Sequence, residues 1–149
     1  MMSIRFLLQT PPVHKEASVG YDPKSHNLYT INEMTSGKSF YQTFGDLVLN
    51  FDVDTGRLYS LDGRIDLAAA NKKSLRWPEG HEEASLLTNK LEIGSIGGAI
   101  KYAFDQESKI FLAECELHGK KLSYAYILEN VVLGLTDEGE LVRVFIRLD

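Results

Sequence analysis

Glu114 and Glu116 are the two carboxylates whose spacing is best suited to acid–base chemistry. In an extended strand, residues i and i+2 point to the same side and lie about 6.5–7 Å apart. Paired carboxylates at such a separation can perform the acid–base steps of a glycosidase. No second feature of the sequence supports this reaction, so we interpret the pair as part of a solvent-exposed sheet face.

Two short segments resemble binding loops but depart from them at essential positions. The segment Asp52–Gly56 resembles the start of an EF-hand calcium loop, yet Gly63 stands where the bidentate carboxylate should be. We therefore predict a hairpin turn. The glycine-rich segment 94–98 could form an anion-binding nest or a nucleophile elbow, but Ile93 occupies the first glycine position of the elbow. We predict a flexible entry into the second half of the chain.

The single cysteine, Cys115, excludes an intrachain disulfide. It alternates with Phe111 and Ala113 on one side of a predicted strand, which favours a small core side chain over a nucleophile. The four histidines are scattered without the spacing of a metal site. We accordingly predict no catalytic residue, no metal and no cofactor.

The charge balance favours a basic protein partner over a nucleic acid. The 149 residues include 21 acidic and 16 basic side chains, for a net charge of −5. A nucleic-acid-binding protein would carry clustered Lys and Arg. Trp77, the only tryptophan, is a candidate apolar anchor for a partner. The candidate acidic contacts lie in two short segments: Glu79, Glu82, Glu83, Asp137, Glu138 and Glu140.

The sequence also predicts a cytoplasmic location without a membrane span. No apolar stretch approaches the roughly 20 residues that a transmembrane helix needs. The apolar run near the N-terminus is too short for a signal peptide, and one cysteine suits a reducing compartment.

An internal repeat indicates how these side chains are positioned. Residues 19–67 and 100–148 show the same order of apolar runs and turns, with Tyr21 matched to Tyr102 and Gly56 to Gly139. Such self-similarity predicts two similar units that arose by duplication. Alternation within the second unit predicts half-buried antiparallel strands, with Arg143 and Arg147 on the solvent side.

We predict an all-β fold with a minor helical part. Two antiparallel β-meanders, in residues 1–65 and 91–149, pack as a sandwich or as one strongly curved sheet, and they form one compact unit. The connector 66–90 begins with a short helix from Asp66 to Trp77, which Pro78 ends, and continues as an acidic loop. The predicted strands are 4–8, 17–21, 28–34, 39–44, 47–52 and 57–61 in the first unit, and 99–104, 109–117, 121–128, 130–135 and 141–148 in the second.

Two functions of different classes fit these features. The first is a non-enzymatic binding protein, such as an inhibitor or immunity-type protein for a basic bacterial toxin, because acidic charge accelerates encounter with a cationic target. The second is a small hydrolase or small-molecule-binding β protein, whose site would lie between the two repeats.

Overall fold

The described part of the chain is built from β-strands and turns and contains no helix. The computed structural model describes residues 6–9, 18–31, 38–79, 82–83, 85–88, 94–96, 98–116 and 121–148. The all-β prediction is therefore confirmed. The strands are β1 (Phe6–Gln9), β2 (Ser18–Asp22), β3 (Asn27–Ile31), β4 (Ser39–Phe44), β5 (Leu47–Asp52), β6 (Leu58–Arg64), β7 (Asn71–Lys72), β8 (Glu82–Glu83), β9 (Ser85–Thr88), β10 (Gly94–Ser95), β11 (Ile100–Asp105), β12 (Ile110–Cys115), β13 (Leu122–Leu128), β14 (Val131–Thr136) and β15 (Leu141–Arg147).

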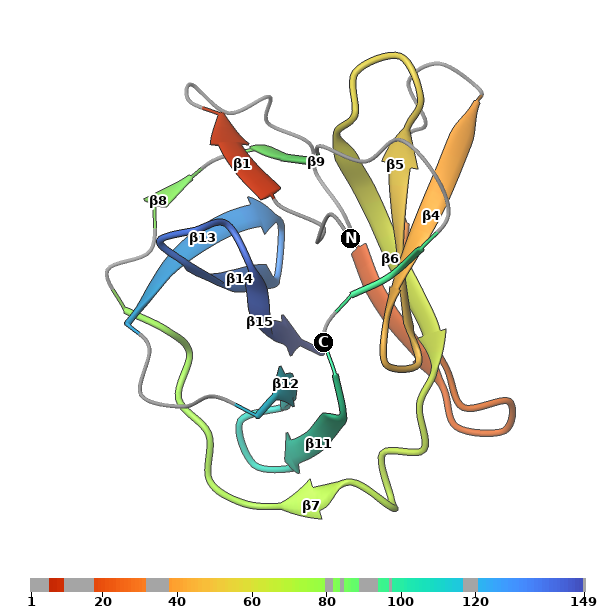
Figure 1. Cartoon of the computed structure of the whole chain (residues 1–149). Coiled ribbons are helices and arrows are strands. Elements are labelled where there is room, and N and C mark those ends of the chain that lie inside the picture. The colour runs from red at the N-terminus through yellow and green to blue at the C-terminus, as the bar shows by residue number, and fades with distance from the viewer. Residues whose placement is uncertain are drawn as a thin grey trace.

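Two large sheets and one small sheet contain all of these strands. The six-stranded sheet has the order β10-β4-β5-β6-β3-β2, and the seven-stranded sheet has the order β7-β11-β12-β15-β14-β13-β8. The small sheet pairs β1 with β9. In Figure 1 the six-stranded sheet stands on the right and β13, β14 and β8 lie on the left.

The strands do not form simple meanders, which corrects the predicted topology. β3 pairs with β6 rather than with β4, and β12 pairs with β15 rather than with β13. The residues typical of turns do not indicate which strands pair, because a connection as long as 32–38 can span about 20 Å when extended. Passing over two strands requires only about 14 Å, so the chain is free to return at the far edge.

The two large sheets nevertheless share one pairing order. It runs β2-β3-β6-β5-β4 in one sheet and β11-β12-β15-β14-β13 in the other. Corresponding strand pairs of the two sheets also shift register. The shift lies between Asn50 and Phe51 in the β5–β6 pair, and between Gly134 and Leu135 in the β14–β15 pair. The turns also agree, because Gly56 and Gly139 both adopt positive φ, at 72° and 84°.

This common register defines corresponding positions in the two sheets. Asp62 lies between Val48 and Tyr29 on the neighbouring strands, just as Phe145 lies between Val132 and Leu112. Asp62 therefore corresponds to Phe145. In the first hairpin, Gly20 and Tyr21 correspond to Ala103 and Phe104. The sequence alignment, which matched Tyr21 to Tyr102, was out of register there by two residues.

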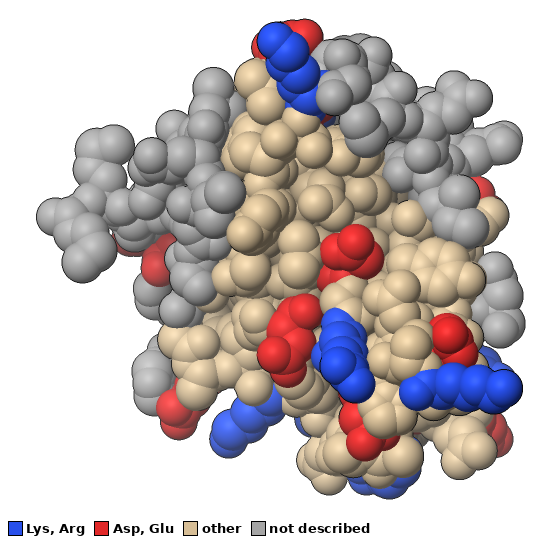
Figure 2. Space-filling view, turned by 90° about the vertical axis from the view of Figure 1, so that its right-hand side faces the viewer, with Lys and Arg blue, Asp and Glu red and all other residues tan. Residues whose placement is uncertain are grey.

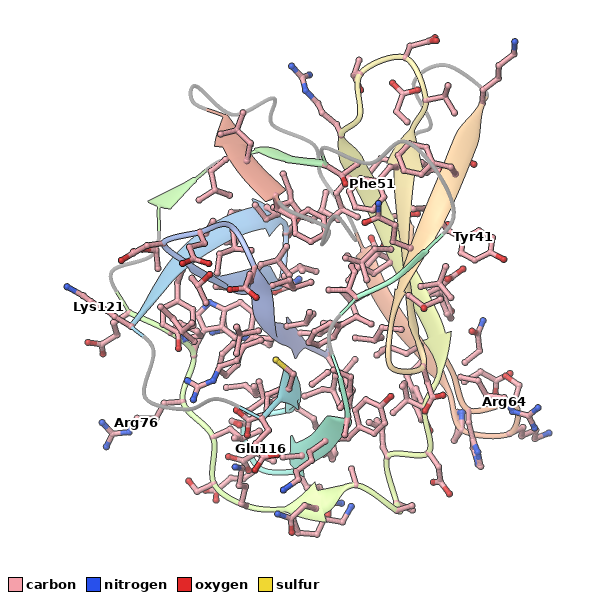
Figure 3. All side chains as sticks on the ribbon, viewed as in Figure 1. Tyr41, Phe51, Arg64, Arg76, Glu116 and Lys121 are labelled. Atoms are coloured by element: carbon pink, nitrogen blue, oxygen red, sulfur yellow. The ribbon has the colours of Figure 1, made fainter. Side chains whose placement is uncertain are left out.

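A common core lies between the two sheets. One apolar cluster contains side chains from both of them, and several members are fully buried. Phe51 is at its centre, stacked on Phe40 and Phe6 with ring centroids 5.3 and 6.1 Å apart. Figure 3 shows Phe51 pointing into the molecule and Tyr41 pointing away from it. The largest fully buried members are Leu28, Phe44, Leu47, Leu49, Phe51, Leu61, Leu86, Phe111, Leu133 and Ile146.

The predicted helix at the start of the connector is wrong. Asp66 accepts a hydrogen bond from the Ala68 amide at 3.0 Å, but only a single turn follows. The chain then forms the short strand β7 and runs on without regular structure to residue 79. Isolated helices of this length are marginal even for good helix formers. Packing of Leu75 and Trp77 on the seven-stranded sheet therefore outweighs the helical propensity of the alanines.

Tyr102 joins the two sheets at one end. Its hydroxyl donates to a carboxylate oxygen of Asp46 at 3.0 Å and accepts from the Asp46 amide at 2.6 Å. Burial, with a further contribution from the Asp46 carboxylate, raises the pKa of Tyr102 to about 12.

The raised pKa of Tyr102 should make folding stability fall at high pH. The unfolded chain loses this proton near pH 10, so the contribution is complete below pH 10 and is lost as the pH rises to about 12. Ultraviolet titration should show a late ionisation step that is missing in Tyr102→Phe. Loss of an ordinary step at about pH 10 in this variant, with the late step unchanged, would contradict the assignment.

Candidate functional site

The connector crosses the outer face of the seven-stranded sheet from one edge to the other. β7 pairs with β11 at one edge, and β8 pairs with β13 at the opposite edge. Between them, residues 73–79, here called the strap, lie on this face. Leu75 and Trp77 of the strap pack on a second apolar cluster, whose buried members are Ala103, Ile110, Leu112, Val132 and Phe145. The strap therefore covers the middle of the outer face. β14 is buried along its whole length, which the prediction of half-buried strands did not anticipate, whereas β11 and β13 keep exposed residues.

Trp77 is held by contacts within the molecule. Its ring meets Phe145 edge-on, with centroids 6.4 Å apart, and the Arg147 guanidinium lies 4.2 Å from its ring centre. The Leu75 amide also donates to the Asp105 carboxylate at 2.9 Å, which fixes the strap on the sheet. Trp77 is half-buried, so its predicted role as an anchor for a partner is limited to its exposed part.

A polar network lies beside the strap on the same face. The Arg143 side chain donates to Glu114 at 3.0 Å and to the Tyr124 hydroxyl at 2.8 Å. Lys73 of the strap approaches the other Glu114 oxygen at 3.8 Å. Glu114 thus has two cationic neighbours, whereas Glu116 is exposed. This geometry favours Glu114 as a structural carboxylate that ties the strap and β15 to β12.

Two open pockets flank the strap. The larger holds about 490 Å³ and the smaller about 320 Å³. Both are lined by the connector and the seven-stranded sheet, and neither has a lining residue from the six-stranded sheet. The larger is lined by Ala69, Asn71, Lys73, Lys101, Tyr102, Ala103 and Glu114. The smaller is lined by Arg76, Trp77, Pro78, Glu79, Tyr124, Arg143 and Phe145.

The predicted acidic contacts lie on the two sides of β13 in the seven-stranded sheet: Glu82 and Glu83 pair with Ala125 and Tyr126 on one side, and the turn with Asp137 and Glu138 follows β14 on the other. β13 has β8 on one side and β14 on the other, so β8 and β14 are about 10 Å apart. At the start of β13, Leu122 pairs with Thr136, directly before the β14–β15 turn. We call this region the acidic corner and define it as Glu79, Glu82, Glu83, Asp137, Glu138 and Glu140.

Exposure differs among the members of the acidic corner. Glu79, Asp137 and Glu138 are exposed, and Glu140 is half-buried. The backbone of Glu82 and Glu83 forms β8, while their side chains lie outside the described part. Arg76 shares a pocket with Glu79, so the strap adds a positive charge at the border of this corner. In Figure 3, Arg76 and Lys121 both extend outward on this side of the molecule.

Comparisons with known proteins leave the site to be interpreted from its geometry. No protein-family model matches the chain, and no curated protein matches it at a significant level.

The remaining candidate motifs are explained by local structure. Residues 53–55 form a turn in which the Thr55 hydroxyl donates to the Asp52 carboxylate at 2.9 Å, as expected for a hairpin. Cys115 is half-buried against the main core. Burial, together with the charges of Glu140 and Glu114, raises the pKa of the Cys115 thiol, which reduces its reactivity at neutral pH.

Two further observations concern metals and membranes. Among the residues that the structure describes, no three His, Cys, Asp or Glu side chains gather where they could hold a metal ion. The described residues also include no helix of the length and apolarity needed to cross a membrane.

Sequence reasoning missed the strap and the Arg143 network. Both depend on which strands are neighbours: Glu114 meets Arg143 only because β12 pairs with β15. The available signal was the apolar spacing of Leu75 and Trp77, which alternates as in an extended segment packed on one face.

Proposed function

We propose that this chain is a non-enzymatic protein that binds a cationic protein partner, in the manner of an inhibitor or immunity protein of a basic toxin. The observation that carries the proposal is the acidic corner, where acidic residues of two segments far apart in the sequence lie on the two sides of β13. An excess of acidic charge raises the rate of encounter with a basic surface. The net charge of −5 acts in the same direction.

The rival hypothesis is a hydrolase or small-molecule site between the two repeats. The two pockets beside the strap do not serve it, because their described lining residues come from the connector and one sheet only. The carboxylate best placed for chemistry, Glu114, is held by Arg143 and Lys73.

The origin of the two sheets and the location of the protein in the cell are part of the proposal. We infer that the two sheets descend from one five-stranded unit by duplication, with residues 1–65 and 91–149 as the two copies and 66–90 as the connector. The shared pairing order and irregularity support this origin. A cytoplasmic location agrees with the single cysteine.

Charge reversal in the β14–β15 turn tests the binding proposal. In Asp137→Lys/Glu138→Lys, association with the partner purified by using the wild-type protein as bait should slow by about three- to tenfold at low salt. The loss should shrink at high salt, because screening removes long-range attraction. Stopped-flow association rates at low and high salt provide the measurement.

The chain offers a matched control for this charge reversal. Asp54 is exposed in the corresponding turn of the six-stranded sheet, which does not contain β8. Asp54→Lys changes the net charge by the same amount per residue but should alter the association rate by less than about twofold. Equal slowing by both variants, or salt-independent binding of the wild type, would count against the acidic corner.

A further inference from the structure

The lateral edges of the two five-stranded units differ in one respect. Three of the four edge strands are each covered by a two-residue strand that runs parallel to them. β10 covers β4 at Gln42 and Thr43, and β8 covers β13 at Ala125 and Tyr126. β7 covers β11. The fourth edge strand, β2, pairs with β3 on one side and with no other strand of the described chain.

The open edge of β2 corresponds to an edge that the chain itself covers. β7 lies beside Ala103 and Phe104 of β11, and the corresponding residues in β2 are Gly20 and Tyr21. An uncovered edge presents a row of backbone N–H and C=O groups that can pair with another strand. Ser18–Asp22 contains no lysine and no proline, two residues that commonly block such pairing, and its one charged residue, Asp22, stands at the end of the strand.

We propose that β2 is a self-association surface, on which β2 of a second copy of this chain pairs in antiparallel orientation about a twofold axis at Gly20. In this register Ser18 of one copy faces Asp22 of the other, and Val19 faces Tyr21. The six-stranded sheets of the two copies would then become one continuous sheet. Twofold dimers of this kind are the commonest symmetric oligomers.

The burial pattern of β2 matches this register on both faces. Val19 is buried and Tyr21 is half-buried against the main core, so pairing them continues the inner apolar face across the junction. Ser18 and Asp22 are exposed. The charges also permit approach, because Ser18, the residue that Asp22 would face, is uncharged.

Gly20 at the proposed axis is explained by the ring that covers it. A Cβ atom at Gly20 would lie 2.5 Å from the Tyr29 ring, so the tyrosine reaches across β2 toward the open edge. In the dimer, the Tyr29 rings of both copies would lie over the two glycines at the axis. The orange-red β2–β3 hairpin stands at the lower right of Figure 1, away from the strap.

The oligomeric state provides the first test. Sedimentation velocity of the wild-type chain should show a mass that rises with concentration toward twice the monomer mass. A monomer at every concentration up to the limit of solubility would overturn the proposal. This result is independent of the acidic corner, which lies on the other sheet, so either proposal can fail alone.

Cysteine crosslinking tests the register in a Cys115→Ser background, where the introduced thiols are the only ones. Residues opposite each other in an antiparallel pair have Cα atoms about 4.5–5.5 Å apart, within the range of a disulfide. A mixture of Ser18→Cys and Asp22→Cys chains should form at least about tenfold more crosslinked dimer than either chain alone. Ser39→Cys, an exposed serine at the start of β4, should not crosslink with itself or with either variant.

A distance measurement keeps the proposal testable if Asp22→Cys disturbs its turn, where the carboxylate binds Lys24 and Ser25. Spin labels on Ser18→Cys should report a backbone separation of about 14 Å, which is four residues along an antiparallel pair. Labels on Ser39→Cys should be farther apart. Two results would overturn this register. One is a Ser18→Cys chain that crosslinks with itself as efficiently as it does in the mixture, and the other is the absence of dipolar coupling between labels at position 18.

Discussion

Replacing Phe145 with aspartate is expected to lower the free energy of unfolding by more than about 4 kcal/mol. Phe145 is 6% exposed and lies under Trp77, at the centre of the cluster that the strap covers. The substitution removes a buried aromatic ring and places a charge among Leu112, Val132 and the indole ring. Natural domains have only about 5–15 kcal/mol of stability in total, so the variant should be largely unfolded or should lose the strap.

The reverse substitution at the corresponding position should have little effect. Asp62 occupies the same place in the six-stranded sheet, yet it is exposed, and no segment that the structure describes covers it. Asp62→Phe should change the stability by less than about 1 kcal/mol. In Figure 2, which views the molecule from the side of this sheet, most of the described surface is uncharged, and the charged side chains gather mainly in the lower half, with a further group at the top.

Chemical denaturation of both variants, followed by tryptophan fluorescence and circular dichroism, provides the measurement. Trp77 reports directly on the strap, because its ring touches Phe145 and Arg147. Phe145→Asp should red-shift its emission even where the far-ultraviolet spectrum is retained. Equal stability of the two variants would show that the strap does not distinguish the two outer faces.

The local elements of this fold could be predicted from the sequence, but their arrangement could not. Alternation of Phe111 and Ala113 with Glu114 identified β12, and the segment Asp52–Gly56 identified a turn. These features depend on neighbouring residues alone. The pairing of β3 with β6 depends on where a long connection returns, and no local residue determines that.

The connector shows how packing can outweigh propensity. The run Leu67–Ala70 favours a helix by composition, and it forms one turn. The segment after it gains more by lying extended, because Leu75 and Trp77 then both reach the outer cluster. A helix would place them on different sides, since residues i and i+2 are about 200° apart around a helix of 3.6 residues per turn.

The candidate site was predicted only in its residue types. Acidic side chains in the connector and the last turn were evident from the sequence. The nearness of the two segments requires β8 to pair with β13, which adds a parallel strand from a segment that reads as an irregular loop. The role of Trp77 in holding the strap was missed for the same reason.

Gly63→Ala is expected to cost about 2–4 kcal/mol of stability, although it adds a single methyl group. Gly63 lies in β6 between Leu28 and Leu47. A Cβ atom there would lie 2.5 Å from the Asp46 carbonyl oxygen and 3.1 Å from the Leu47 Cα. These are backbone atoms, so the β4–β5 turn itself would have to move.

Movement of that turn would also disrupt the hydrogen bonds that link the two sheets, because Asp46 is the partner of the Tyr102 hydroxyl. Tyr102→Phe alone should cost about 1 kcal/mol. Because Gly63→Ala already displaces Asp46, the double variant should lose less stability than the sum of the two single losses.

Gly98→Ala is the control, since a Cβ atom at Gly98 meets nothing within 4 Å. Urea denaturation of the four variants measures these differences. If Gly63→Ala were as mild as Gly98→Ala, or strictly additive with Tyr102→Phe, the turn would not be the rigid link between the sheets that its contacts indicate.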